Sequence, residues 1–175
     1  VTGGTKALAS TVSGAPTRDG DAMVIRPSAV GTSVVLTSEQ INAIGGEVYP
    51  ATHTFSFYAR FFNEGANPSP TDAVVPVLKW YDSSDTLLQT DIGDPTILST
   101  TDWTRVHVTS LAPAPTAYGI GEISFTPSTS ASVSLIVDQA LAEESPFVNS
   151  YFDGSGGVVS LSNLFWEGTV NASRS

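Results

Sequence analysis

The sequence predicts an all-β protein, an antiparallel β-sandwich, and three observations support that fold class. Apolar residues alternate with polar residues at a spacing of two through much of the chain, which is typical of strands with one buried face. Runs rich in Gly, Pro, Ser, Asn and Asp separate these short segments at regular intervals, as turns between strands do. Only one short stretch has the pattern of a helix start. Many short strands with regular turns are typical of two packed antiparallel sheets.

The N-terminal part of the chain predicts three strands. They are expected over Lys6–Val12, Ala22–Arg26 and Thr32–Leu36, and the turn-rich segment Ser13–Gly20 separates the first two. The chain starts without Met, which predicts that it begins inside a longer polypeptide.

The one predicted helix follows the third strand. Thr37-Ser-Glu-Gln40 has the form of a capping box, and Ile41 and Ile44 follow at helical spacing before two glycines. We therefore expect one or two helical turns around Ser38–Ile44.

The strongest strand pattern is Thr52–Phe62. Phe55, Phe57, Ala59 and Phe61 fall on one side of an extended chain, and Thr54, Ser56, Tyr58, Arg60 and Phe62 fall on the other. The first side needs a second sheet to cover it, whereas the second side is left as a wet surface or a binding surface.

The middle of the chain predicts a hairpin. The strand Ala73–Asp82 contains Pro76, which suggests an edge or a bulge, and Ser83-Ser-Asp85 turns the chain into a second strand, Thr86–Thr90.

Three more strands complete the sandwich, over Asp102–Thr109, Tyr118–Phe125 and Ser132–Leu141. In the first of them Val106 and Val108 are expected to point inward and Arg105 and His107 outward. The residues expected between the two sheets are Phe55, Phe57, Val74, Leu78, Val106, Val108 and Ile136.

The composition changes near Phe147. We predict a sandwich domain over residues 1–146 and an extended linker or docking segment over residues 147–175, which is rich in Gly yet keeps large apolar side chains. Its candidate docking residues are Tyr151, Phe152, Phe165 and Trp166.

Charge and composition exclude several function classes. The chain has 7 Lys+Arg against 17 Asp+Glu, a net charge of -10, which disfavours binding to nucleic acid or to an anionic membrane. It has no cysteine, so packing rather than disulfides must stabilise it, and no apolar run long enough for membrane insertion.

Several short motifs resemble a known family. They are Thr54-Phe-Ser-Phe-Tyr-Ala-Arg60, Leu78-Lys-Trp-Tyr-Asp82, Asp102-Trp-Thr-Arg105, Ala112-Pro-Ala-Pro115 and Leu135-Ile-Val-Asp-Gln-Ala-Leu141, followed by Tyr151-Phe-Asp-Gly154 and Trp166-Glu-Gly-Thr-Val-Asn-Ala-Ser-Arg-Ser175. Together they resemble the carbohydrate-binding-module-like jelly-roll domain, a galactose-binding type of fold, in minor tail proteins of siphophages that infect actinobacteria. The resemblance covers the chain from about Gly20 to the end, and it implies that the family's first strand is missing from this sequence.

The sequence offers one candidate carbohydrate-binding face. Side chains that suit a saccharide lie on the strand sides opposite the apolar rows, because aromatic rings stack under sugars and charged donors bind hydroxyls. They are Tyr58, Arg60, Lys79, Tyr81, Arg105 and His107. The alternative is an ordinary solvated sheet face, or a face covered by a neighbouring subunit. Trp80 and Trp103 adjoin apolar rows, so we expect both to pack in the core.

Neither a cofactor nor a catalytic site is predicted. Asp138 lies where the related jelly rolls often place a structural calcium ligand, and Asp19 and Asp21 offer further oxygens, but these signals predict no metal site. The two histidines, His53 and His107, have no nucleophile elbow, zinc helix or cysteine partner. We therefore expect a protein that is not an enzyme.

Three functional hypotheses remain open. The resemblance implies an extracellular virion module in the phage tail, which contacts host-surface glycan and either other tail proteins or copies of itself. The second hypothesis is a purely structural spacer in the same tail. The third is a carbohydrate-binding domain of a secreted bacterial glycoside hydrolase, since one fold can host many functions.

Overall fold

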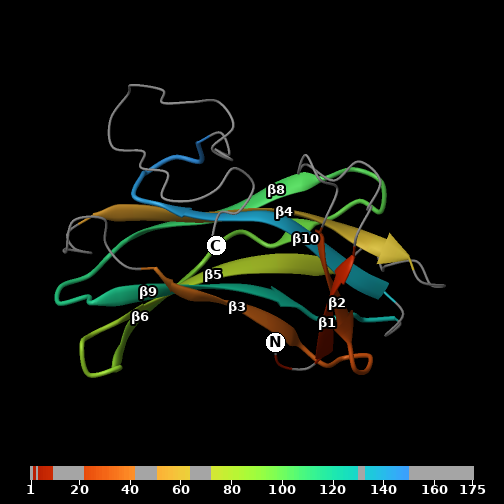
Figure 1. Ribbon diagram of the computed structural model, residues 1–175, viewed down its shortest axis with the longest axis horizontal. Helices are drawn as coiled ribbons and strands as arrows, with labels where there is room; N and C mark the ends of the chain where they lie inside the picture. Colours follow the sequence, from red (N-terminus) through yellow and green to blue (C-terminus); the bar gives the residue numbers. More distant parts are fainter. Residues whose placement is uncertain are drawn as a thin grey trace.

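The computed structural model describes residues 2, 4–9, 22–41, 51–63, 72–129 and 133–149, and it confirms the antiparallel sandwich (Figure 1). Sheet A has the order β3 (Val34–Ile41), β9 (Tyr118–Phe125), β5 (Ala73–Tyr81) and β6 (Leu87–Ile92), with β7 (Thr96–Ile97) also paired to β5. Sheet B has the order β1 (Gly4–Ala9), β2 (Ala22–Pro27), β10 (Val133–Glu143), β4 (Thr52–Asn63) and β8 (Thr104–Leu111). The described part of the chain contains no helix long and apolar enough to cross a membrane.

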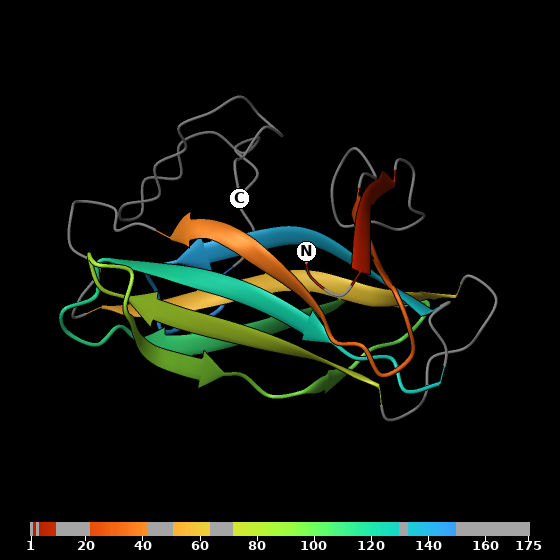
Figure 2. The same cartoon turned by 90° about the horizontal axis from the view of Figure 1, so that it is seen from below.

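The chain passes repeatedly from one sheet to the other. Strands β2, β4, β8 and β10 belong to sheet B, and the strands between them in the sequence belong to sheet A. Figure 2 shows the strands of sheet A side by side in the order β3, β9, β5 and β6. This alternation places β4 between β10 and β8, so the strand with the strongest sequence pattern is internal in its sheet.

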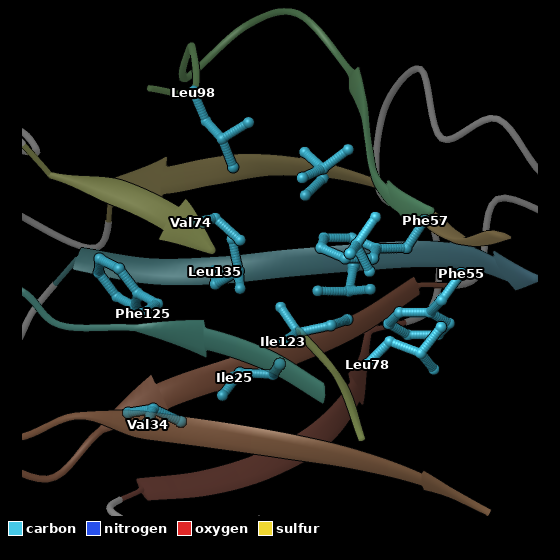
Figure 3. Close-up of a cluster of buried hydrophobic side chains, with 14 of the residues drawn as sticks. Ile25, Val34, Phe55, Phe57, Val74, Leu78, Leu98, Ile123, Phe125 and Leu135 are labelled. Atoms are coloured by element: carbon cyan, nitrogen blue, oxygen red, sulfur yellow. The ribbon is translucent and has the colours of Figure 1, made fainter. Parts of the chain in front are cut away.

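The hydrophobic core lies between the two sheets, as the alternating pattern predicts. Phe55, Phe57 and Phe61 of β4 belong to one buried cluster with Leu78 and Trp80 of β5. Figure 3 labels Phe55, Phe57 and Leu78 in this cluster. Fully burying a side chain of this size typically stabilises the folded state by about 1.5–3 kcal/mol relative to leaving it exposed. Six of the seven predicted core residues belong to this cluster.

Ile136 is the exception, and its predicted place between the sheets is wrong. It is buried, but it pairs with Arg60 and Val24 on the opposite side of β10 from Leu135. It therefore belongs to a small apolar cluster on the outer side of sheet B, together with Ala22, Val24 and Trp103.

Two glycines of β9 make room for the largest rings of the core. A Cβ atom on Gly119 would lie 2.7 Å from the Trp80 ring, and one on Gly121 would lie 2.7 Å from the Phe55 ring. Both distances are below any normal contact, so the absence of side chains at these positions is what allows the rings to rest on β9.

A short polar chain links the sheets at one end of the core. The indole N–H of Trp80 donates to the hydroxyl of Ser110 over 2.8 Å, and this hydroxyl donates to the carboxylate of Asp91. Trp80 and Asp91 belong to sheet A and Ser110 to sheet B, so the hydrogen bonds cross between the sheets. Buried polar atoms need such partners, because an unpaired one costs about 1–3 kcal/mol.

The helix predicted around Ser38–Ile44 is wrong in its first half. Residues up to Ile41 continue strand β3, which pairs with β9 from Val34 to Ile41, and residues 42–50 lie outside the described part. The register shifts between Thr37 and Gln40, and the hydroxyl of Ser38 accepts the backbone N–H of Gly121. At this bulge the Ser38 side chain therefore bonds to the neighbouring strand β9, and no helix is capped there.

Pro76 lies at an irregular place in its strand, as its presence predicts. On one side of β5, β7 pairs with Ala73 and Val74, whereas β6 pairs with the residues from Val77 onward. The carbonyl of Pro76 accepts the N–H of Gly93, from the turn between β6 and β7. The backbone nitrogen of Pro76, which carries no hydrogen, therefore faces the gap between β6 and β7. No hydrogen bond of the sheet is lost there. The two-residue strand β7 was not expected from the sequence.

Candidate functional site

The outer face of sheet B gathers polar and aromatic side chains in register. Tyr58 of β4 lies between Asp138 of β10 and Arg105 of β8, and the next outer residue of β4, Arg60, is opposite Ile136. These side chains face away from the core because their neighbours Phe57 and Ala59 face into it. We call this surface the B face; it comprises Thr54, Ser56, Tyr58, Arg60, Trp103, Arg105, His107, Ile136 and Asp138.

Arg60 and Trp103 form the first stacked pair of the B face. The guanidinium carbon of Arg60 lies 5.3 Å from the centre of the Trp103 ring, and Arg60 donates from Nη1 to the carbonyl of Thr100 over 2.7 Å. The indole also packs on Val24 and Ile136. A cation over an indole face is attracted by the ring quadrupole, so the two side chains hold each other in place.

Arg105 and Tyr58 form a second pair of the same kind. The guanidinium carbon of Arg105 lies 5.4 Å from the centre of the Tyr58 ring. Arg105 also donates from Nη2 to the hydroxyl of Ser56 over 2.9 Å, and from Nη1 to the carbonyl of Asn149. Ring, hydroxyl and carbonyl together fix the plane of this guanidinium.

Two buried donors of the B face have no hydrogen-bond partner within the described residues. They are Nε1 of Trp103 and Nε of Arg105. A buried N–H without an acceptor costs about 1–3 kcal/mol, so a small shift of either side chain toward an acceptor would be favourable.

The margin of the B face contains both an exposed and a buried side chain, His107 and Thr54. His107 is paired with Ser56 across the strands, and its side chain is open to solvent. Thr54 and Thr109 share a hydrogen bond of 2.8 Å between their hydroxyls, and Thr54 also donates to the carbonyl of Ser145. The residues that follow β10 therefore lie along this end of the face.

The six predicted carbohydrate-binding residues do not share one face, and that part of the prediction is wrong. Tyr58, Arg60, Arg105 and His107 lie on the B face, whereas β5 carries Lys79 and Tyr81 on the outer side of sheet A. Residue parity fixes the side of a strand to which a side chain points, but it does not identify the sheet to which the strand belongs.

Lys79 and Tyr81 instead have partners on sheet A. The ammonium of Lys79 is 2.8 Å from the carboxylate of Glu122, and the ring of Tyr81 is stacked on that of Tyr118 with centres 5.2 Å apart. The hydroxyl of Tyr118 donates to Asp85; burial first, and then this hydrogen bond, raise the pKa of Tyr118.

Trp103 is, like Ile136, a residue whose predicted place in the core is wrong. It was expected to pack in the core, as Trp80 does, but it lies half-buried on the B face. A usable signal was present, because Trp103, Arg105 and His107 follow one another at a spacing of two and therefore share a strand side.

The metal and docking candidates have little structural description. Asp138 is buried in β10 and accepts the backbone N–H of Gln139 over 2.7 Å, where the chain has a positive φ of 49°. The described residues contain no group of three His, Cys, Asp or Glu that could hold a metal ion. The other candidates, namely Asp19, Asp21, Tyr151, Phe152, Phe165 and Trp166, lie outside the described part of the chain.

Comparison with known proteins finds the fold but no sequence family. No protein-family model matches the chain, and no curated protein sequence matches it significantly. Among solved structures, the C-terminal family 22 carbohydrate-binding module of Clostridium thermocellum Xyn10B is 16% identical with a TM-score of 0.54, and the match covers 83% of this chain and 84% of the module. The CBM22-2 xylan-binding domain of Paenibacillus barcinonensis Xyn10C is 16% identical with a TM-score of 0.51, covering 81% and 88%.

A phage protein has a similar fold. The enzymatically active domain of tailspike protein 4 from bacteriophage CBA120 is 9% identical with a TM-score of 0.55. The match covers 81% of this chain and 19% of the tailspike chain, so this chain spans about a fifth of that protein. At such identities the comparisons show a carbohydrate-binding-module-like β-sandwich and nothing more specific.

Proposed function

We propose that this domain binds carbohydrate through the B face of sheet B. The observation that carries the proposal is the pairing of Tyr58 with Arg105 and of Trp103 with Arg60 on one surface. Aromatic rings stack on the C–H faces of sugars, and guanidinium groups donate to their hydroxyls, so this mixture suits a saccharide. The similarity of the fold to carbohydrate-binding modules supports the same assignment.

The fixed conformation of the Arg105 side chain also favours binding. Its side chain is already fixed by Tyr58, Ser56 and Asn149, so less conformational entropy is lost when a ligand binds. After a small side-chain shift, the N–H groups at Nε1 of Trp103 and Nε of Arg105 could donate hydrogen bonds to a sugar hydroxyl.

We further propose that the domain is a non-enzymatic, extracellular module of a phage tail that contacts host-surface glycan and neighbouring tail proteins. The motifs Tyr151–Gly154 and Trp166–Ser175 support this context through their resemblance to minor tail proteins, and the similar fold in a phage tailspike is compatible with it. A module of a secreted glycoside hydrolase remains the second candidate, because similar folds occur in Xyn10B and Xyn10C.

Titration calorimetry with short, monovalent oligosaccharides tests the binding site. The probes are xylohexaose and oligosaccharides from the cell wall of the actinobacterial host. Tyr58→Ala should weaken affinity about fivefold, since an aromatic contact is worth about 1 kcal/mol. Tyr81→Ala is the matched control: it removes the same ring from the outer face of the other sheet, and affinity should stay unchanged.

The pattern of binding distinguishes the candidates. Binding to host cell-wall oligosaccharides alone supports the tail adhesin, and binding to xylohexaose alone supports the glycoside hydrolase module. If the wild-type protein binds neither probe, or if both variants lose affinity equally, carbohydrate binding by the B face is refuted and the structural spacer becomes the better explanation.

A further inference from the structure

The outer face of sheet A carries a row of apolar side chains among polar ones. On β5 and β9 the outward positions include Val75, Val77 and Ile120, and the neighbouring strands add Ile92 and Ile97. Ile92 is 69% exposed and Ile97 is 61% exposed. We call this surface the A face; it comprises Val35, Thr37, Gln40, Ala73, Val75, Val77, Lys79, Tyr81, Leu87, Thr90, Ile92, Ile97, Tyr118, Ile120, Glu122 and Ser124.

We propose that the A face is a self-association surface, which binds the A face of a second copy of this chain. Leu87, Ile92 and Ile97 are exposed on β6 and β7 and adjoin the half-buried Val75 and Ile120, and exposed apolar side chains that gather in this way are typical of a protein interface. This proposal does not depend on carbohydrate binding, since it concerns the opposite side of the sandwich.

The charges of the A face favour a second copy as the occupant. The whole chain has a net charge of -10, so two copies repel each other over most of their surfaces. The outward positions of β5 and β9 contain only two charges within the described residues, Lys79 and Glu122, and these form an ion pair. A face with one charge of each sign is its own complement, because a two-fold axis can bring Lys79 of one copy to Glu122 of the other.

The size of the A face agrees with a weak, specific dimer. Four strands at about 4.8 Å spacing and about eight residues at about 3.3 Å each give a flat area of roughly 500 Å² per copy. The total buried surface would thus be about 1,000 Å² or more, near the lower limit for specific interfaces. We expect association in the micromolar range, with the two facing sheets aligned as in a sandwich.

Sedimentation equilibrium of the full chain from about 1 to 500 µM tests the proposal. The wild type should show a concentration-dependent shift from monomer to dimer. Ile92→Glu should weaken association at least tenfold, because it puts a charge into an apolar part of the interface, on the edge strand β6. Leu111→Glu is the matched control: Leu111 is 59% exposed on β8 of sheet B, and its replacement should leave association unchanged.

A charge exchange identifies the partner as a second copy. Lys79→Glu leaves two anions on each A face and Glu122→Lys leaves two cations, so each variant alone should be monomeric, whereas an equimolar mixture should form a heterodimer. Thermal unfolding confirms that the variants are folded.

Three results would overturn the proposal. The first is a wild type that stays monomeric at the highest concentration. The second is an equal effect of Ile92→Glu and Leu111→Glu on association. The third is an equimolar mixture of Lys79→Glu and Glu122→Lys that contains only monomers. A monomeric wild type would refute a second copy as the occupant of the A face.

Discussion

Two glycines of β9 leave room for two large rings of the core, one from each sheet. Gly121 lies under the ring of Phe55, and Gly119 lies under the ring of Trp80, each with less space than one methyl group needs. Each ring fills the space that a side chain on β9 would otherwise occupy. Each ring and its glycine therefore form one packing unit, in which neither residue can change without the other.

Gly121→Ala tests this packing unit. The added methyl group would meet three atoms of the Phe55 ring at 2.7–2.8 Å, which forces the ring or the strand to move. Overpacking of this kind typically costs about 1–3 kcal/mol. Urea denaturation should show that loss for Gly121→Ala and a change within about 0.5 kcal/mol for Ser124→Ala, an outward position of the same strand. An unchanged midpoint for Gly121→Ala would contradict the packing described for β9.

At the scale of elements, the hairpin between β5 and β6 is ordered by one carboxylate. Asp82 accepts the backbone N–H groups of Ser84 and Thr86 over 2.8 and 2.9 Å, and Asp85 has a positive φ of 62°. The hydrogen bond from Thr86, and then the one from Ser84, lower the pKa of Asp82 below its ordinary value of 3.8.

This lowered pKa makes hairpin stability depend on pH with a definite sign. Because the folded pKa of Asp82 lies below the unfolded value, its contribution is complete above pH 3.8 and is lost as the pH falls through the folded pKa. The carboxyl group should titrate by NMR with a midpoint below 3.8. The stability difference between wild type and Asp82→Asn should be largest near neutral pH and should shrink in acid. A midpoint at or above 3.8 would rule this account out.

Some secondary-structure elements could be predicted from the sequence and others could not. Strands β4 and β9 follow clear alternation, and their predicted ranges agree with the structure to within a residue. The predicted helix failed because a capping-box pattern is local, whereas Ser38 finds its hydrogen-bond partner in β9, 83 residues later in the chain. Strand β7 has two residues, too few for any periodicity.

At the scale of the whole molecule, the candidate site was only partly predictable. Parity correctly placed Tyr58, Arg60, Arg105 and His107 on outward strand sides, but it could not separate them from Lys79 and Tyr81. That separation depends on strand order, which is set by the repeated passage of the chain between the sheets. The strand side of each residue was therefore predicted correctly, whereas the grouping of all six on one face was wrong.

The two outer faces point in opposite directions, which gives the proposed dimer a specific property. If two copies associate through their A faces, the two B faces lie on opposite sides of the assembly. Such a dimer cannot place both sites on one flat surface, but it can join two separate glycan chains.

This geometry predicts that the wild type cross-links long glycan chains whereas an association-deficient variant does not. With a soluble polysaccharide that the domain binds, dynamic light scattering should show larger particles for the wild type than for Ile92→Glu. Both proteins should bind a short oligosaccharide with equal affinity in calorimetry, because Ile92 lies on the A face. Tyr58→Ala should instead lose affinity and cross-linking together. Equal particle sizes for wild type and Ile92→Glu would show that the two B faces do not act as a pair, since cross-linking requires two sites in one assembly.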